Sequence, residues 1–294
     1  MEFVIVGDIR NPVDPLTQSG RVDYPYEIAK CPVTNEEYAE FLNAVAVHED
    51  PFGLYSPNME TGLFGGIRRI QKEGGYFYET LPGYERLPVV YVSFYDAARF
   101  ANWLHYGRKK TGRQEIGTTE GNESSGAYPT SLFPSEIDRM KNEKVKSHHP
   151  GARYWIPTLD EWNKAAFYDP TRKKNKSYWL YAMRSDEKPK CVEPCNDPKA
   201  ANYFDFKWAC PGQFLSPAGS YPQATSYYGT CDQNGNVWEW VETLRCGSFQ
   251  RWVRGGAAST FEDALRRTNC DSEYSDHQLY SFGFRVAKKM GIGE

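Results

Sequence analysis

The chain lacks any long hydrophobic run. Its hydrophobic residues make up 40% of 294 positions, and no segment approaches the roughly 20 consecutive apolar residues that a membrane-spanning helix needs. The first twelve residues show no basic stretch followed by an apolar segment and a small-residue cleavage site, so they do not predict a secretory signal. We therefore expect no membrane span, and a location that is either cytoplasmic or reached by an export route without a recognisable signal.

An excess of positive charge is also missing. The 35 Lys and Arg residues are outnumbered by 38 Asp and Glu residues, which gives a net charge of -3. Nucleic-acid binding depends on clustered basic side chains that neutralise phosphates. The composition therefore excludes nucleic acid as the first hypothesis and leaves an unidentified protein or small ligand as the partner. It does not indicate an oligomeric state.

Potential metal ligands are few and scattered. The chain has seven cysteines, an odd number, and five histidines. In a chain of this size most of the cysteines are expected to be buried or incidental thiols. Cys191 and Cys195 bracket a proline-containing loop and fit a disulfide or a metal, but no second pair stands at zinc-ligand spacing. No two histidines have the HxxxH or HExxH spacing that places two imidazoles on one helical face.

Aromatic residues are abundant, and three segments carry a helix-start pattern. The 8 Trp, 21 Tyr and 16 Phe residues supply ample material for a packed core. At Thr34, Ser93 and Thr158, the hydroxyl residue is followed three positions later by Glu or Asp, which is the capping-box pattern. Apolar residues then recur at helical spacing. Short apolar runs predict strands at 3–6, 89–92, 237–241, 252–254 and 284–287.

Long irregular segments fill much of the remaining chain. Residues 107–150 and 170–235 are rich in Gly, Pro, Ser, Asn and Lys without periodicity, which predicts loops. No segment has the composition of a linker that would divide the chain. The sequence therefore predicts a single α+β domain over residues 1–294, with two or three helices around a small twisted antiparallel sheet. Loops of this length in a compact domain need metals or aromatic packing to hold them.

Six motifs occur in an order that resembles a known family from one end of the chain to the other. They are KCPVTNEEYAEF at 30–41, LPVVYVSFYDAARFANWL at 87–104, RYWIPTLDEWNKAA at 153–166, GNVWEW at 235–240, RGG at 254–256 and GFRV at 283–286. This set resembles the sulfatase-modifying-factor family, which includes the formylglycine-generating enzymes. The resemblance implies a C-type-lectin-like fold with little regular secondary structure, and it accounts for the long loops.

The sequence departs from that family where its oxidase activity resides. The resemblance implies a pair of copper-binding cysteines a few residues after the RGG motif, because a thiolate is soft enough to hold reduced copper. Residues 257–264 contain no cysteine, Cys246 precedes the motif and Cys270 lies too far beyond it. Copper and formylglycine generation are therefore not expected. A second branch of the family holds iron through histidines and a carboxylate on an additional helical domain, and iron is not expected here either. No catalytic residue is assigned.

One metal-binding pattern remains. In the sequence DQNGNVWE at 232–239, two carboxylates flank backbone carbonyls, the hard oxygen set that calcium prefers. The resemblance to the family's calcium loop implies that Asp232 and Glu239 ligate through carboxylates and that Gly235 and Val237 ligate through carbonyls. A structural calcium ion is therefore the expected cofactor. The alternative is a tight turn that leads into a Trp-rich strand.

The segment between the RGG and GFR motifs, residues 257–282, is the candidate ligand-binding region of a non-catalytic binding protein. The resemblance extends to the variable proteins of diversity-generating retroelements, which display mutable residues between such motifs. Adenine mutagenesis never converts Asn codons to Lys, and this segment contains no lysine, although Glu262, Glu273 and Gln278 would have to be fixed positions. The candidate binding residues are Ser259, Thr260, Phe261, Arg267, Asn269, Asp271, Tyr274, His277 and Tyr280.

The sequence makes a structural prediction for this segment and leaves two other functions open. Six of the candidates, Phe261, Asn269, Asp271, Tyr274, His277 and Tyr280, are predicted to form one patch, with at least half of them accessible to solvent. The first alternative is a metal-dependent oxidoreductase whose site is built from Cys270, Asp271 and His277. The second is an inactive structural paralogue that assembles with a partner.

Overall fold

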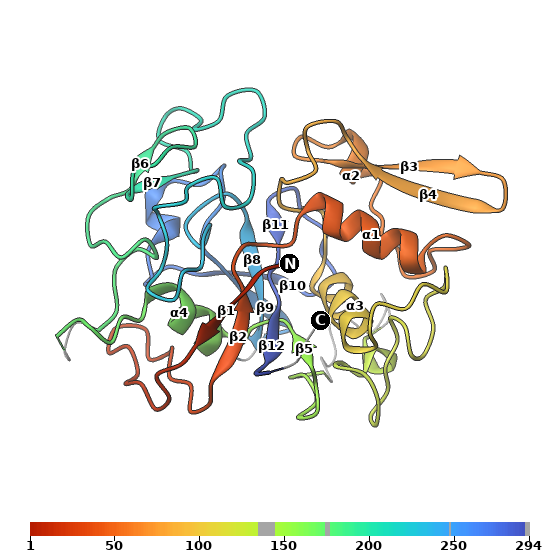
Figure 1. Ribbon diagram of the computed structural model, residues 1–294, viewed down its shortest axis with the longest axis horizontal. Coiled ribbons are helices and arrows are strands. Elements are labelled where there is room, and N and C mark those ends of the chain that lie inside the picture. Colours follow the sequence, from red (N-terminus) through yellow and green to blue (C-terminus); the bar gives the residue numbers. More distant parts are fainter. Residues whose placement is uncertain (135–144, 174–176, 247, 292–294) are drawn as a thin grey trace.

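The computed structural model describes residues 1–134, 145–173, 177–246 and 248–291. Short helices and strands are separated by long loops, which is the expected α+β arrangement. The helices of the described chain are α1 (Asn35–Val45), α2 (Asn58–Thr61), α3 (Phe94–His105) and α4 (Leu159–Phe167). Helices α1 and α3 lie on one side of the molecule, and α4 lies on the other side (Figure 1). No helix in this part of the chain is both long and apolar enough to cross a membrane.

The three predicted capping boxes are present. The Thr34 hydroxyl accepts a hydrogen bond from the Glu37 backbone N–H, and the Glu37 carboxylate accepts one from the Thr34 backbone N–H at 3.1 Å. Helices α3 and α4 begin with the same reciprocal pair, formed by Ser93 with Asp96 and by Thr158 with Glu161. Each cap satisfies backbone donors that a helix leaves free at its first turn, and is worth about 1 kcal/mol.

The strands form two four-stranded sheets and two small ribbons. The first sheet has the order β1 (Phe3–Val6), β2 (Tyr26–Ala29), β12 (Ala287–Lys289), β5 (Tyr154–Trp155). The second has the order β10 (Asp271–Tyr274), β9 (Gln250–Arg254), β8 (Trp238–Leu244), β11 (Phe282–Gly283), and its β8–β11 pair is parallel. The ribbons are β3 (Ile67–Lys72) with β4 (Gly75–Thr80), and β6 (Lys190–Cys191) with β7 (Ala200–Ala201). The first sheet therefore joins the beginning of the described chain to its end.

Two of the five strand predictions were wrong. Residues 89–92 are buried but form no strand, because Tyr91 has a left-handed backbone with φ of 60°. The N–H of Val89 donates to Val33, and the N–H of Tyr91 donates to Leu279, so their partners lie on different segments. Residues 284–286 connect β11 and β12 rather than continuing a strand.

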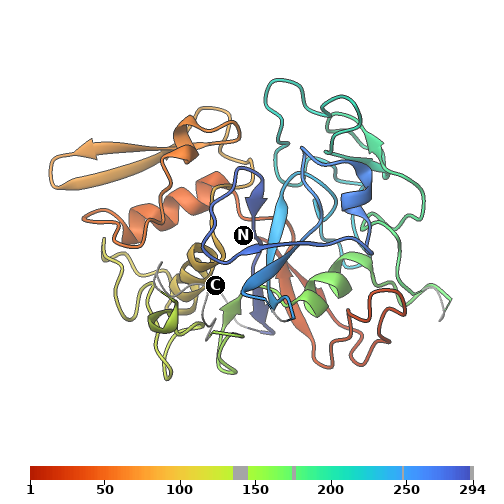
Figure 2. The ribbon, with the colours of Figure 1, turned by 180° about the vertical axis from the view of Figure 1, so that it is seen from behind.

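Aromatic packing joins the motifs in the core. Phe41 of α1 and Phe100 of α3 meet edge to face, with ring centroids 5.2 Å apart. Phe284 of the GFRV motif contacts Phe100 at 5.3 Å. Strands β8 to β12, drawn in blue, lie between the α1–α3 side and the α4 side, as the view from behind shows (Figure 2).

Candidate ligand-binding surface

The candidate segment, residues 257–282, begins at a turn that requires glycine. Gly255 and Gly256 have φ values of 95° and 73°, in the left-handed region that side chains disfavour. A Cβ atom on Gly256 would lie 2.7 Å from Leu265 Cδ1. The two residues that follow, Ala257 and Ala258, are buried. The RGG motif therefore fixes the point at which the segment leaves β9.

The six residues predicted to form a patch are all at least partly accessible. Phe261 and Tyr280 are 49% and 44% exposed, and Asp271 is also exposed. Asn269, Tyr274 and His277 are half-buried. Tyr274 and His277 lie at and just after the end of β10, where their rings contact each other with centroids 5.2 Å apart. Phe261 and Tyr280 make ring contacts with other parts of the chain instead, so the segment presents two groups of residues rather than one.

The three remaining candidates are Ser259, Thr260 and Arg267, which lie in or contact the turns that support the candidate segment. The Thr260 hydroxyl accepts a hydrogen bond from Ala257 N–H and donates one to Ala257 C=O, and Ser259 lies half-buried within that turn. The Arg267 guanidinium donates to the carbonyl of Tyr178, and its Nε lies 3.4 Å from Asp14 Oδ2. The side chains of Thr260 and Arg267 thus make internal contacts, and a ligand-binding role for them stays a prediction.

Seven aromatic side chains, which we call the aromatic surface, are connected through ring contacts. The Phe261 ring lies 5.4 Å from Phe204 and 5.6 Å from Phe206, measured between centroids. Tyr280 lies 5.4 Å from Phe64. Ring contacts through Trp208 and Phe214 link Phe204 to Phe64, and so connect these two ends of the candidate segment. The full set is Phe64, Phe204, Phe206, Trp208, Phe214, Phe261 and Tyr280. Phe206, Phe261 and Tyr280 are its exposed members, and Phe64 is buried beneath them.

Phe206 is the most exposed member of the aromatic surface. Its side chain is 87% exposed, and its backbone has a φ of 56°. The turn is closed by a hydrogen bond from Asp205 N–H to Lys207 C=O at 3.1 Å. A bulky residue in the left-handed region costs about 1–2 kcal/mol. The fold thus displays an apolar ring at a strained position, and such strain gathers at functional sites.

The sequence analysis missed five of the seven rings. Phe204, Phe206 and Trp208 stand at alternate positions in the sequence FDFKW, which was the one local signal available. Phe64 and Phe214 carry no local signal. The place of Phe64 beside Tyr280 depends on the fold, because the two residues come from distant parts of the chain, whereas Phe214 lies beside Trp208, its near neighbour in the sequence.

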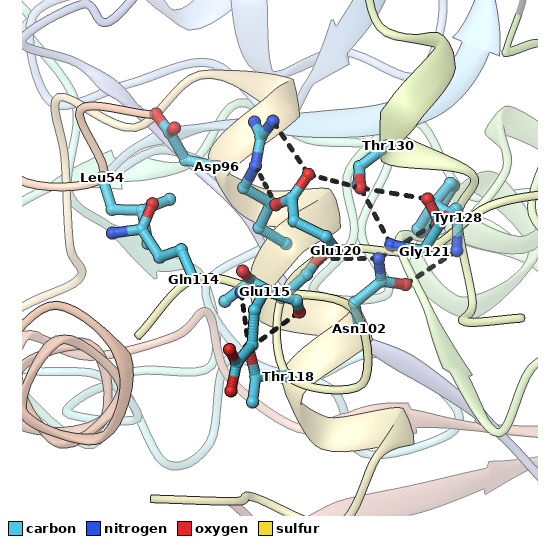
Figure 3. Close-up of polar contacts among 12 residues, drawn as sticks. Leu54, Asp96, Asn102, Gln114, Glu115, Thr118, Glu120, Gly121, Tyr128 and Thr130 are labelled. Atoms are coloured by element: carbon cyan, nitrogen blue, oxygen red, sulfur yellow. Dashed lines mark hydrogen bonds and ion pairs between the residues drawn. The ribbon is translucent and has the colours of Figure 1, made fainter. Parts of the chain in front are cut away.

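A second feature is a polar cavity of about 860 Å³ beside the start of α3. Within it, Arg99 Nε donates to Glu120 Oε1 at 2.7 Å, and the guanidinium lies 4.0 Å from the centroid of the Phe52 ring. Glu120 Oε2 also accepts a hydrogen bond from the Thr130 hydroxyl at 2.7 Å (Figure 3). These buried charges neutralise one another, which is typical of an architectural network.

Asp96 connects this cavity to the candidate segment. Burial raises the pKa of the Asp96 carboxyl to about 6, although hydrogen bonds from Gln278 and Ser93 act in the opposite direction. Gln278 Nε2 donates to Asp96 Oδ2 at 2.9 Å and to the carbonyl of Gly53 at the same distance. Gln278 therefore fixes the end of the candidate segment to α3.

The predicted calcium loop contains an internal ion pair. Glu239 is fully buried, and its two carboxylate oxygens accept hydrogen bonds from Arg285 at 2.5 and 2.6 Å. Trp162 Nε1 donates a third hydrogen bond at 2.7 Å. This arrangement differs from that expected of a calcium ligand, because the charge of Glu239 is already balanced. Calcium binding by the loop stays a prediction.

The other predicted carboxylate ligand of the loop lies near two thiols. Asp232 Oδ2 accepts a hydrogen bond from Gly219 N–H at 2.6 Å, and burial raises the pKa of this carboxyl to about 6. Its carboxylate lies within 4.8 Å of the sulfur atoms of Cys31 and Cys231. The expected carbonyl ligands, Gly235 and Val237, are buried in the turn that leads into β8.

The fold and its motifs define a protein of the sulfatase-modifying-factor class. The family model described as the sulfatase-modifying factor enzyme 1-like domain matches residues 10–290, and the chain belongs to this family. The hercynine oxygenase of Mycolicibacterium smegmatis is 24% identical over 232 residues, which are 76% of this chain and 38% of that relative. This chain thus spans well under half the length of that relative.

Solved structures share the fold. CarF is 21% identical with a TM-score of 0.57, and the match covers 98% of each chain. Treponema denticola variable protein 1 is 16% identical with a TM-score of 0.50, and the match covers 97% of this chain and 94% of that protein. These two similarities establish the architecture, which hosts more than one function.

The proposed oxidoreductase alternative can be compared with the described side chains. Cys270 and Asp271 are exposed, and His277 Nδ1 lies 3.1 Å from Glu273 Oε1. Across the described ranges, three potential ligand atoms come within 4.8 Å of one another only at Cys31, Cys231 and Asp232. The residues of the alternative site therefore do not form such a group.

Proposed function

We propose that this chain is a non-catalytic binding protein that contacts a protein partner through the aromatic surface. The observation that carries the proposal is the exposure of Phe206, 87%, together with its ring contact to Phe261 at the start of the candidate segment. Clustered exposed aromatic rings mark recognition surfaces, because they bury a large area at low conformational cost.

A protein partner fits this surface better than a small ligand does. The rings come from three segments, with Phe206, Phe261 and Tyr280 exposed, and the cavities of about 550 and 860 Å³ are lined by other residues. Charged pairs lie beside the rings. Lys188 pairs with Asp205 at 2.9 Å and Arg266 with Glu262 at 2.7 Å. An apolar centre with a charged rim is typical of protein interfaces.

A more specific form of this hypothesis is that a retroelement diversifies the binding residues of the candidate segment. Phe261 and Tyr280 belong to the candidate segment, and both are reachable from Asn codons by adenine changes. The shared fold with a variable protein is compatible with the idea. The deciding observation is the genomic neighbourhood, where a reverse transcriptase gene and a near-identical template repeat are expected.

The binding function can be tested with a random-peptide display library selected on the full chain. The double variant Phe206→Ser/Phe261→Ser removes the centre of the aromatic surface, and Leu16→Ser removes an exposed apolar side chain elsewhere. Selected peptides should bind the wild type and the Leu16→Ser control equally, and the double variant at least about tenfold more weakly. Equal binding to all three proteins, or a selection without enriched peptides, would contradict the proposal.

A second candidate function is catalysis, for which the relationship to an oxygenase is the supporting observation. The candidate catalytic residues do not converge in the described structure, so this remains the weaker proposal. An inactive paralogue that assembles with a partner would use the aromatic surface in the same way as a binding protein. Identifying the bound partner distinguishes these two hypotheses, because an inactive paralogue is expected to assemble with another member of this family.

A further inference from the structure

Two thiols that the proposed binding function does not use lie in contact just after the end of β2. The Sγ atoms of Cys31 and Cys231 are 3.1 Å apart, although 200 residues separate them in the sequence. Their backbones are joined as well, because Cys231 N–H donates to the carbonyl of Lys30 at 2.8 Å. The framework therefore holds the two sulfur atoms together.

A carboxylate completes the group. The ligand atoms of Asp232, Cys31 and Cys231 all lie within 4.8 Å of one another. Asp232 is 8% exposed, and its carboxylate accepts a hydrogen bond from Gly219 N–H. Arg285 lies close by, but its guanidinium donates to both oxygens of Glu239, which balance its charge.

A bound cation suits this group better than a disulfide does. A disulfide would draw the sulfur atoms to about 2.05 Å and leave a buried carboxylate beside a neutral bond. Tetrahedral zinc, with Zn–S distances of about 2.3 Å, holds two thiolates about 3.8 Å apart and also accepts a carboxylate oxygen. The thiols need to separate by less than about 1 Å to reach that geometry.

Space for a metal and for its entry is present. Gly219 has a φ of 76°, and a Cβ atom on it would lie 3.2 Å from Cys31 Sγ. Cys31 is partly exposed and lines a cavity of about 280 Å³ together with Lys30, Pro32 and Arg86. This cavity therefore offers an entry route to the group on the Cys31 side.

We propose that Cys31, Cys231 and Asp232 form a zinc site with two thiolate ligands and one carboxylate ligand. Binding converts both thiols to thiolates, and their two protons pass to solvent. The ion links the end of β2 to the segment before the GNVWEW motif, so it stabilises the native state. This site is separate from the aromatic surface and does not depend on the proposed binding function.

The experiment uses the full chain, reduced and stripped of metal under anaerobic conditions. After addition of zinc and desalting, the wild type should retain about one zinc per chain by mass spectrometry. Cobalt(II) should give the charge-transfer absorption of a thiolate-ligated ion, and excess calcium should leave that absorption unchanged. The variants Cys31→Ser and Asp232→Asn should bind zinc at least about tenfold more weakly. The control Cys246→Ser/Cys270→Ser, which removes two exposed cysteines, should bind as the wild type does.

A measurement on the wild type alone covers the case in which a variant fails to fold. Zinc should slow the alkylation of Cys31 by iodoacetamide at least about tenfold, while Cys270 continues to react at its original rate. The proposal is overturned if the reduced wild type retains no zinc, if Cys31→Ser retains as much as the wild type, or if zinc leaves Cys31 as reactive as before. Recovery of a Cys31–Cys231 disulfide in a chain that takes up no zinc after reduction would show a redox pair instead.

Discussion

Arg285 donates two hydrogen bonds to Glu239, at 2.5 and 2.6 Å, in a place where neither side chain is exposed to solvent. The guanidinium also donates to the backbone carbonyls of Ala29, Lys30 and Cys231. One side chain of the GFRV motif therefore joins β2, the segment before β8 and β8 itself. In this chain the two motifs that contain these residues serve the framework.

Removing the carboxylate of this pair should destabilise the fold strongly. We expect Glu239→Ala to lower the free energy of unfolding by about 3–5 kcal/mol, because Arg285 would be left buried without a counter-charge. Asp23→Ala, which breaks an ion pair between two exposed side chains, should have little effect. Urea unfolding measures both. A loss below about 1 kcal/mol for Glu239→Ala would show that another group balances Arg285.

This prediction also bears on the test for calcium. Because Glu239→Ala removes the partner of Arg285, its effect on melting does not report a lost metal ion. Calcium titration of the wild type is the appropriate measurement. In the zinc-free chain, in which Asp232 is not engaged by the proposed zinc site, calcium binding through Asp232 and Glu239 should raise the melting temperature as calcium increases. An unchanged melting temperature would show that the loop is a turn.

Phe206 should contribute to binding without stabilising the fold. Replacing it with glycine removes an exposed ring and relieves the strain of a left-handed backbone conformation. Glycine also loses more backbone entropy on folding, which offsets part of the stability gained. We expect Phe206→Gly to change the free energy of unfolding by less than about 1 kcal/mol. Affinity for peptides selected on the aromatic surface should fall at least about tenfold. A large loss of stability would show that the Phe206 ring packs as core.

Stability should depend on pH through Asp96. Because burial raises the pKa of this carboxyl from 3.8 to about 6, the native state binds the proton more tightly than the unfolded chain does. This contribution is fully present below about pH 4 and is lost as the pH rises through about 6, a change of about 3 kcal/mol. Asp96→Asn should flatten this part of the pH profile of unfolding, and the exposed-site control Glu49→Gln should retain it. Parallel profiles for Asp96→Asn and the wild type would refute the assignment.

The chain should not generate formylglycine. The segment after Gly256 runs from Ala257 to Ala264 without a cysteine, and Cys270 beyond it is exposed and alone in that region. Two convergent thiolates are therefore missing at the place where the family's oxidases bind copper. Incubation with a sulfatase-motif peptide, copper and oxygen should leave the peptide cysteine unconverted, as shown by mass spectrometry. Efficient conversion to the aldehyde would contradict this reading.

The sequence by itself determined the features that depend on neighbouring residues. The capping boxes at Thr34, Ser93 and Thr158 and the glycines of the RGG motif follow from local hydrogen bonding and backbone sterics, which act over three or four positions. The order of the motifs was sufficient to predict the family and the fold. The strands at 89–92 and 284–287 were predicted wrongly, because apolar alternation does not reveal which segment accepts each backbone hydrogen bond.

Only the tertiary structure decided which distant side chains meet. It placed Phe261 and Tyr280 in contact with aromatic rings from other segments, and it assigned Arg267 to the framework. It also paired Glu239 with Arg285 and brought Cys31 within 3.1 Å of Cys231. The physical reason is the same in each case. Such contacts depend on how the whole chain closes, and residues 46 or 200 positions apart leave no periodic signal in the sequence.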